Sequence, residues 1–231
     1  MTTTETKPRA KAKAKAPPKP KAQRREETTT RILDVAEALF ARDGLHGVTL
    51  KAVAKEAGVD TALLHYYFDD KNRLFSTVFG RRAEVVNKLR LDSLDRYEAE
   101  HGDAMTVRGA IDAFLRPLFV LFDNGDPAWL NYAALVAQVN NTPVWGGDTM
   151  HKHFDPVIDR FIGVLRRIAP ETPPRQIYWF YHLLSGSLTL SLAQTGRIDV
   201  LSGGLCQSSE MGAICDAMEA VFTGGFEAIR R

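Results

Sequence analysis

Apolar residues recur at helical spacing along most of this chain, and no strand-like alternation competes with them. The first such segment places on one helix face Ile32, Val35, Ala36, Leu39 and Phe40. Threonines at positions 28 to 30 can cap this helix, and Gly44 can end it. The pattern therefore predicts an all-α fold whose first helix begins near residue 28.

Two short helices are predicted directly after the first one. Thr49 can cap the earlier of the two, whose apolar face holds Leu50, Val53, Ala54 and Ala57. Gly58 then breaks this helix, and Asp60 can cap the next one. In that third helix Leu64 and Phe68 face inward, because they lie four residues apart. Two short helices joined by a tight glycine turn form a helix-turn-helix.

The rest of the chain continues the helical pattern. We expect helices over residues 72–98, 105–123, 127–141, 148–169, 174–195 and 208–230. Pro117 and Pro156 fall inside two of them and should kink or restart those helices. Residues 176–196 carry no charge over a membrane-spanning length, but His182 and several serines there would be costly in lipid. We interpret this run as a buried helix at a subunit contact.

Charge divides the chain unevenly. Residues 1–27 carry nine Lys/Arg against three Asp/Glu, whereas residues 28–231 carry 21 against 25. Residues 1–26 hold almost no large apolar side chains and cannot offset the entropy of ordering, so we predict a disordered basic tail. Such a tail is simply solvated or adds non-specific contacts to phosphate, and both can hold at once. It lacks the apolar core of a secretory signal, so we expect no export.

The stretch over residues 29–75 reads TTRILDVAEALFARDGLHGVTLKAVAKEAGVDTALLHYYFDDKNRLF. It resembles the N-terminal domain of TetR/AcrR-type transcriptional regulators in its first helix, in AVAKEAGV of the second helix and in LLHYYFDDKNRLF after it. The resemblance implies a homodimer with a helix-turn-helix DNA-binding domain, here residues 27–75, and a C-terminal helical bundle, here residues 76–231. In that family the bundle dimerises through its last two helices and holds a cavity for a small-molecule effector.

The predicted reading helix is short of positive charge, because residues 60–70 contain three acids and no Lys or Arg. Hydroxyls and helix-start amides can nevertheless donate hydrogen bonds to phosphate oxygens without carrying a full charge. The resemblance places at phosphate-contacting positions Thr49, Tyr66, Tyr67 and Lys71. Tyr67 could equally belong to the core, so both roles stay open for this residue.

Four further residues are predicted to face base edges. The resemblance places Thr61 and Ala62 at the exposed start of the reading helix and His65 where tyrosine is often found. Small residues there allow close entry into the major groove, where Thr61 can hydrogen-bond bases and Ala62 can meet a thymine methyl group. His65 can hydrogen-bond a base, and Lys51 is the candidate for guanine O6 and N7.

Aromatic and polar residues on the middle helices form the candidate effector site. The residues selected are Arg116, Phe119, Trp129, Tyr132, Trp145, Tyr178 and His182. Aromatic residues at helical spacing also build plain cores, so each of these residues has a structural alternative. Residues 74–94 resemble the opening bundle helix of TetR-like regulators of fatty-acid or aromatic-acid catabolism. That resemblance implies an apolar or aromatic acid, free or CoA-linked, as the effector.

Metal and enzyme chemistry are not indicated. His151 and His153 would point about 200° apart on a helix, whereas two-histidine metal motifs use i, i+4 spacing. The sequence has no phosphate-binding glycine loop and no nucleophile elbow, so we expect no cofactor and no catalysis. The only two cysteines, Cys206 and Cys215, are too few for a disulfide scaffold and indicate free thiols in a reducing cytosol.

Together these features predict a ligand-responsive transcriptional repressor in the cytoplasm. It would bind a pseudo-palindromic double-stranded DNA operator as a homodimer and would be released by a small-molecule effector. An effectorless or activating regulator stays open as an alternative, and so does a small-molecule-binding helical protein or enzyme without DNA binding. The identities of the effector and the operator are left open.

Overall fold

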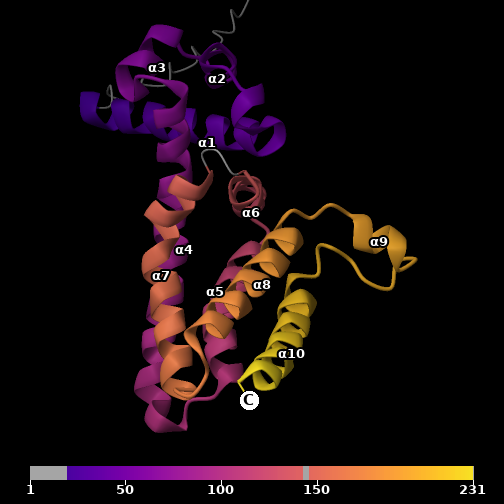
Figure 1. Ribbon diagram of the computed structural model, residues 1–231. Helices are drawn as coiled ribbons and strands as arrows, with labels where there is room; N and C mark the ends of the chain where they lie inside the picture. The colour runs from indigo at the N-terminus through magenta and orange to yellow at the C-terminus, as the bar shows by residue number, and fades with distance from the viewer. Residues whose placement is uncertain (1–19, 143–145, 231) are drawn as a thin grey trace, which may run out of the picture.

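The computed structural model describes residues 20–142 and 146–230, and all regular structure within them is helical, as predicted (Figure 1). In chain order the helices are α1 (Lys21–Gly47), α2 (Leu50–Ala57), α3 (Thr61–Phe68), α4 (Lys71–His101), the 3-10 turn η1 (Gly102–Ala104), α5 (Val107–Phe122), α6 (Pro127–Asn140), α7 (Gly146–Ile168), α8 (Pro174–Leu192), α9 (Arg197–Leu201) and α10 (Met211–Ile229).

The first three helices gather at one end of the molecule, and α4 runs from them along its full length (Figure 1). Helix α7 lies beside α4, and α5 packs between α4 and α10. Helix α6 lies under α1 and contacts α4, α7 and α8 as well. The long helix α4 therefore belongs to both units that the sequence predicts, because the expected boundary at residue 75 falls inside it.

Helix α1 begins at Lys21, so the predicted disordered tail ends too late. Residues 21–26 are helical, and the predicted cap at positions 28 to 30 is wrong. The Thr28 hydroxyl donates to the Arg24 carbonyl at 2.7 Å, which places this threonine inside the helix. Strong helix formers such as lysine, glutamine, arginine and glutamate carry the helix back beyond the apolar stripe. Residues 1–19 of the predicted tail lie outside the described residues.

The predicted helix-turn-helix is confirmed down to its caps. Gly44 leaves helical geometry with φ 71°, a region that favours glycine. The Thr49 hydroxyl accepts from the Ala52 amide at 3.1 Å at the start of α2. Gly58 ends α2 in the left-handed conformation with φ 64°. The Asp60 carboxylate then accepts from the amide at position 62 at 2.8 Å and starts α3.

The remaining helices lie where the periodicity predicts them, with ends shifted by a few residues. Neither Pro117 in α5 nor Pro156 in α7 divides its helix, so the expected restart does not occur at either proline. A proline removes one backbone hydrogen bond, whereas Phe114 and Leu118 beside Pro117 are both buried in the core. Packing therefore holds the helix together across the lost bond.

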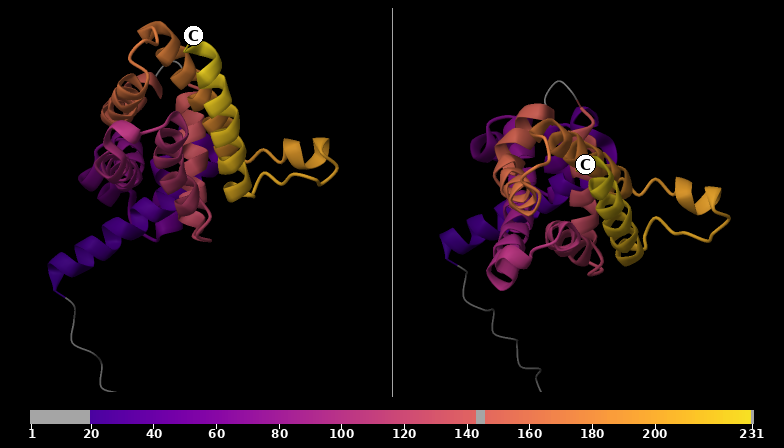
Figure 2. Two further views of the ribbon diagram at one scale, coloured as in Figure 1. Left: turned by 90° about the horizontal axis from the view of Figure 1, so that it is seen from below. Right: turned by 60° about the horizontal axis from the view of Figure 1, so that its bottom comes forward.

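A short helix, α9, was not predicted. It lies on an excursion between α8 and α10 that projects away from the bundle in every view (Figures 1 and 2). Its apolar side chains at Val200, Leu201 and Leu205 are exposed. Glycines at 196, 203 and 204 adopt positive φ and shape the ends of this segment. No helix in the described residues is long and apolar enough to span a membrane.

Candidate nucleic-acid interface and bundle cavity

Helix α3 presents a small polar face at its start. Ala62, His65 and Tyr66 are exposed and Thr61 is half-buried, while Leu64 and Phe68 are buried. The inward pair anchors the helix on the domain core, as the spacing predicts. The side chains of α3 that are predicted to face bases therefore do not belong to the domain core. The two at the N-terminal end of the helix, Thr61 and Ala62, are short.

His65 has one ring nitrogen committed and one free for recognition. Its Nδ1 lies 2.8 Å from the Asp69 carbonyl oxygen, and a carbonyl can only accept, so Nδ1 carries a proton. In the neutral ring Nε2 is then an acceptor. An acceptor there suits the amino groups of adenine N6 or cytosine N4 in the major groove. The structure thus leaves Nε2 as the acceptor with which His65 would make its predicted base contact.

The two tyrosines of α3 differ in their surroundings. Tyr66 is 75% exposed, and its hydroxyl can reach outward. Tyr67 is half-buried, and the Arg25 guanidinium lies 5.3 Å from its ring centroid. This contact brings the basic first turns of α1, with exposed Lys21 and Arg24, beside the reading helix. These residues were not placed on a helix by the sequence, because the first helix was expected to begin near residue 28 rather than at Lys21.

The predicted phosphate contacts Thr49 and Lys71 and the predicted base contact Lys51 lie on either side of this face. Thr49 is exposed, and since its oxygen accepts the Ala52 amide, its hydroxyl hydrogen stays available to donate. Lys51 is exposed on the next turn. Lys71 is half-buried as the first residue of α4, directly after Asp70, whose carboxylate caps that helix. All eight predicted residues therefore lie on α2, α3 and their flanks.

A buried ion-pair cluster joins α1 to the bundle, and we call it the joint. Glu37 on α1 is only 1% exposed. Its carboxylate accepts from Arg81 at 2.8 Å and from Arg82 at 2.9 Å, both on α4. Burial alone would lower the pKa of Arg82, but the hydrogen bond to Glu37 raises it overall. The Arg82 guanidinium also lies 4.7 Å from the ring centroid of Trp129 on α6, so three helices meet here.

An internal cavity of about 30 Å³ lies where helices α4 to α8 converge. A space of this size holds roughly one or two waters. Its wall is apolar except for Arg90, Tyr132, Tyr181, Ser185 and Thr189. The Tyr132 hydroxyl is buried without a hydrogen-bond partner in the described residues, and burial raises its pKa. The cavity thus combines a mostly apolar wall with one buried hydroxyl that lacks a partner.

A surface groove of about 610 Å³ between the ends of α6, α7 and α8 adjoins this cavity. The residues that line both spaces are Met150, Ile158, Tyr181, Ser185 and Thr189. A single layer of side chains therefore separates the groove from the interior. Methionine is a flexible member of that layer, which makes it easy to displace.

The predicted effector residues do not gather around one space. Tyr132 lines the cavity, and Tyr178 and His182 line the groove. Phe119 is buried in the core and Trp129 belongs to the joint, so neither lines the cavity or the groove. Trp145 lies outside the described residues. Aromatic spacing alone does not distinguish a cavity wall from core, because both are buried and apolar.

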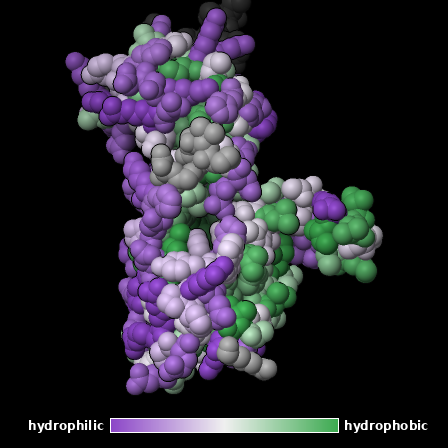
Figure 3. Space-filling model, in the orientation of Figure 1, coloured by the Kyte–Doolittle hydropathy of each residue, from purple (hydrophilic) through white to green (hydrophobic). Residues whose placement is uncertain are grey.

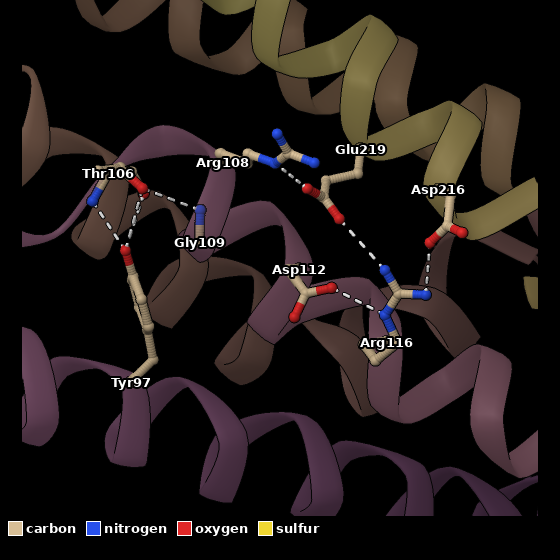
Figure 4. Close-up of polar contacts among 8 residues, drawn as sticks. All are labelled: Tyr97, Thr106, Arg108, Gly109, Asp112, Arg116, Asp216 and Glu219. Carbon is tan, nitrogen blue, oxygen red and sulfur yellow. Dashed lines mark hydrogen bonds and ion pairs between the residues drawn. The ribbon is translucent and has the colours of Figure 1, made fainter.

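Arg116 lies in a different environment from the one predicted for it. It points from α5 to α10, where it bonds Asp112 at 2.8 Å and Glu219 at 3.2 Å and pairs with Asp216 at 2.8 Å (Figure 4). Burial opposes its charge, but the hydrogen bonds that Arg116 donates to Asp112 and Asp216 raise its pKa overall. With three carboxylates around it and no place in the cavity wall, Arg116 fastens two helices together.

Figure 4 also shows how the start of α5 is held. The Tyr97 hydroxyl of α4 accepts from the Thr106 amide at 2.8 Å, and Thr106 caps α5 through the Gly109 amide at 3.1 Å. A side chain at Gly109 would collide with the Tyr97 ring. The cavity-lining helices are therefore fixed at this end of the bundle.

The histidines of α7 serve separate surroundings. His151 lies 3.1 Å from the Asp155 carboxylate on the surface. His153 packs against Gly80 and the Phe79 ring on α4, and burial lowers its pKa. The two imidazoles point to different sides of the helix, so they do not converge on a common site.

Helices α8 and α10 share an exposed apolar surface, which continues onto the α9 excursion (Figure 3). Its members include Trp179, Leu183, Leu190 and Val221, all more than half exposed. An apolar groove of about 410 Å³ runs between the two helices. Contiguous exposed apolar side chains of this kind are typical of protein–protein contacts.

Two protein-family models match the chain. The model of the bacterial regulatory proteins of the tetR family matches residues 32–78, and the model of the tetracyclin repressor-like C-terminal domain matches residues 112–225. The first match covers α2, α3 and the buried part of α1. The second covers most of the helices that surround the cavity and carry the apolar surface.

Individual relatives agree with this assignment. The chain is 35% identical over 86 residues to the transcriptional regulator AcrR of Shigella flexneri, covering 37% of this chain and 38% of that protein. It is 34% identical over 61 residues to the repressor SCO4008 of Streptomyces coelicolor, covering 26% and 32%. It thus spans about a third of each relative's length. The fold resembles a tetR-family protein from Shewanella sp. PV-4, with a TM-score of 0.57 and 18% identity over 86% of this chain and 97% of that chain.

Proposed function

This chain belongs to the TetR family of bacterial regulatory proteins, and from that premise we propose that it is a cytoplasmic transcriptional repressor. It binds a pseudo-palindromic DNA operator as a homodimer and is released by a small apolar or aromatic effector. The observation that carries the proposal is the capped α2–α3 unit, which holds Leu64 and Phe68 in the core and leaves the start of α3 free. The relatives are regulators as well, which agrees with a non-enzymatic role.

The division of contacts on DNA follows from the positions of the side chains. Hydroxyls of Thr49 and Tyr66, together with Lys71, hold phosphates and set the register of the reading helix. Thr61, Ala62 and His65 then face base edges in the major groove, with Lys51 beside them. The positive charge that α3 lacks is supplied by neighbours, including the start of α1 next to Tyr67.

The homodimer uses the apolar surface of α8 and α10. Side chains such as Trp179 and Val221 lie exposed there in a single chain, and burying them against a second copy removes their contact with water. A two-fold axis beside these helices presents two copies of α3 to successive major-groove faces, about 34 to 36 Å apart. An effector acts by favouring a bundle conformation that no longer fits this spacing.

A second candidate is favoured by one observation. The cavity of about 30 Å³ is far smaller than a drug-sized ligand site of roughly 300 Å³ or more. A regulator without an effector would have such a filled interior. We favour the ligand-responsive form because the adjoining groove shares five residues with the cavity. The two forms differ in whether any small molecule changes DNA affinity.

The proposal is tested by gel shift with DNA from upstream of the protein's own gene and with random DNA of equal length. Wild-type protein should prefer the upstream DNA, and its affinity should fall steeply as salt rises. Tyr66→Phe should weaken binding to both DNAs by a similar factor. Lys51→Gln should lower the preference between them by roughly tenfold, because it removes a base contact. A folded dimer that binds upstream and random DNA equally well would refute the proposed repressor function.

A further inference from the structure

Arg90 is a buried cation without a carboxylate partner. It is 4% exposed, on the same stripe of α4 as the buried residues Val86 and Leu94. Its Nε donates to the Phe114 carbonyl oxygen at 3.0 Å, and its guanidinium lies 3.6 Å from the Phe114 ring centroid. In the described part of the chain no carboxylate forms an ion pair with it. By contrast, Arg81, Arg82 and Arg116, which also join helices, each have a carboxylate beside them.

This arrangement of Arg90 is energetically unfavourable. Burial lowers the pKa of Arg90 to about 10, so the side chain still carries its charge at neutral pH. A buried charge that lacks an opposite charge is costly, and proteins normally pair it. One hydrogen bond and one aromatic ring satisfy only part of the guanidinium, which has five N–H donors. The other N–H groups of the Arg90 guanidinium can therefore donate to a further acceptor.

The surroundings of Arg90 favour an anion. The Tyr132 and Tyr181 rings come from α6 and α8 to the same cavity. Burial raises the pKa of both hydroxyls, so both remain protonated and can donate. The Tyr132 hydroxyl is fully buried and has no partner in the described residues. The Arg90 guanidinium and the Tyr132 hydroxyl therefore both have a donor to offer in a wall that is mostly apolar.

We propose that Arg90, together with the Tyr132 hydroxyl, receives the carboxylate of a small aromatic or aliphatic monocarboxylic acid. The apolar body of the acid lies among the side chains shared by the cavity and the groove, such as Met150 and Ile158. The inference deepens the proposed function, on which it rests, by naming the chemical class of the effector and its anchoring residue. A planar guanidinium matches a carboxylate through two parallel hydrogen bonds.

Entry of the acid requires a rearrangement of side chains. The cavity of about 30 Å³ is too small for benzoate, whereas the groove of about 610 Å³ is large enough. Displacement of Met150 and Tyr181 would join the two spaces. Asp155 and Asp159 line the outer groove and repel a carboxylate that stays there. The acid group is therefore favoured only at the inner end.

The experiment measures thermal unfolding and calorimetric binding of the full chain with benzoate and octanoate, and with the uncharged benzamide and octanol. Wild-type protein should bind an acid at least tenfold more tightly than its uncharged counterpart. Arg90→Met should abolish this preference, Tyr132→Phe should weaken acid binding several-fold, and Arg90→Lys should retain part of it. Arg116→Gln is the control and should bind acids as the wild type does.

A second measurement needs no ligand. If Arg90 is a binding residue, Arg90→Met should melt at or above the wild-type temperature, because it removes a buried unpaired charge. If Arg90 holds the bundle together, the variant should melt well below it. Three outcomes would each overturn the proposal. They are this lower melting temperature, binding of acids by Arg90→Met as tightly as by the wild type, and failure of both acids to bind the wild type. Sequence-preferring DNA binding is measured separately on the same preparation. The proposed repressor function can therefore hold even if the acid site is refuted.

Discussion

Two buried charges in this molecule are handled in opposite ways. At the joint, Glu37 is 1% exposed and accepts from both Arg81 and Arg82. At the cavity, Arg90 is 4% exposed and has no carboxylate partner in the described residues. Both charges interrupt the apolar face of a helix, at positions where a hydrophobic residue would pack. Only the first is neutralised by the protein itself.

The difference separates a structural contact from an incomplete one. A paired and hydrogen-bonded buried charge fixes how its helices meet, because any other arrangement would leave it unpaired. An unpaired buried charge is more easily understood as a site that something else completes. The joint and the cavity are also neighbours, because the Tyr132 ring lies 6.2 Å from the Trp129 ring. A change in the cavity can therefore reach the contact that holds α1.

The largest effect is expected from breaking the joint. Glu37→Gln removes the carboxylate and leaves two partly buried arginines without their central partner. We expect the free energy of unfolding to fall by about 3 kcal/mol. Urea denaturation, followed by circular dichroism, measures this loss. The variant should also lose DNA affinity, because Glu37 fixes α1 against α4, and α1 belongs to the domain that positions α3.

Asp34 provides a matched control on the same helix. It also pairs with Arg81 at 2.8 Å, but its side chain is 55% exposed. Solvent screens an exposed pair, so Asp34→Asn should lower stability by no more than about 1 kcal/mol. Equal losses from the two variants would contradict the view that the joint is a buried structural contact.

A smaller effect should come from the link between the joint and α6. The Arg82 guanidinium over Trp129 is a cation–π contact on a buried ring. A double-mutant cycle with Arg82→Met and Trp129→Leu should give an interaction energy of about 1 kcal/mol. Urea denaturation of the two single variants and the double variant supplies the cycle. If the losses in the free energy of unfolding are additive, Arg82 and Trp129 do not interact, and the cation–π contact does not couple α6 to the joint.

Local rules explain why the N-terminal domain could be predicted from the sequence. The caps at Thr49 and Asp60 and the turn at Gly58 each act over three or four residues, so they are readable one after another. The error at the start of α1 has the same origin. Thr28 can cap a helix or bond back to a carbonyl inside one, and only the residues before it decide between them.

The cavity could not be predicted in this way, because its walls come from five helices. Phe119 and Tyr132 have similar sequence surroundings, yet only Tyr132 reaches the cavity. A usable signal was present in the spacing of Val86, Arg90 and Leu94, which puts an arginine on an apolar stripe at i, i+4. Arg116 was selected instead, because it stands in a helix that is more apolar than α4.

The smallest effect is expected from Arg116 itself, and it sharpens the contrast with Arg90. Arg116 is 34% exposed, and Arg108 also pairs with its buried partner Glu219. Arg116→Gln should therefore lower the free energy of unfolding by only about 0.5 kcal/mol, because Glu219 keeps a cation and the aspartates stay hydrated. Urea denaturation measures the loss, and titration with benzoate measures the response to acid. If Arg116→Gln is stable yet no longer binds acids, the anchoring residue is Arg116 and not Arg90. The contrast between a paired structural arginine and an unpaired binding arginine would then be wrong.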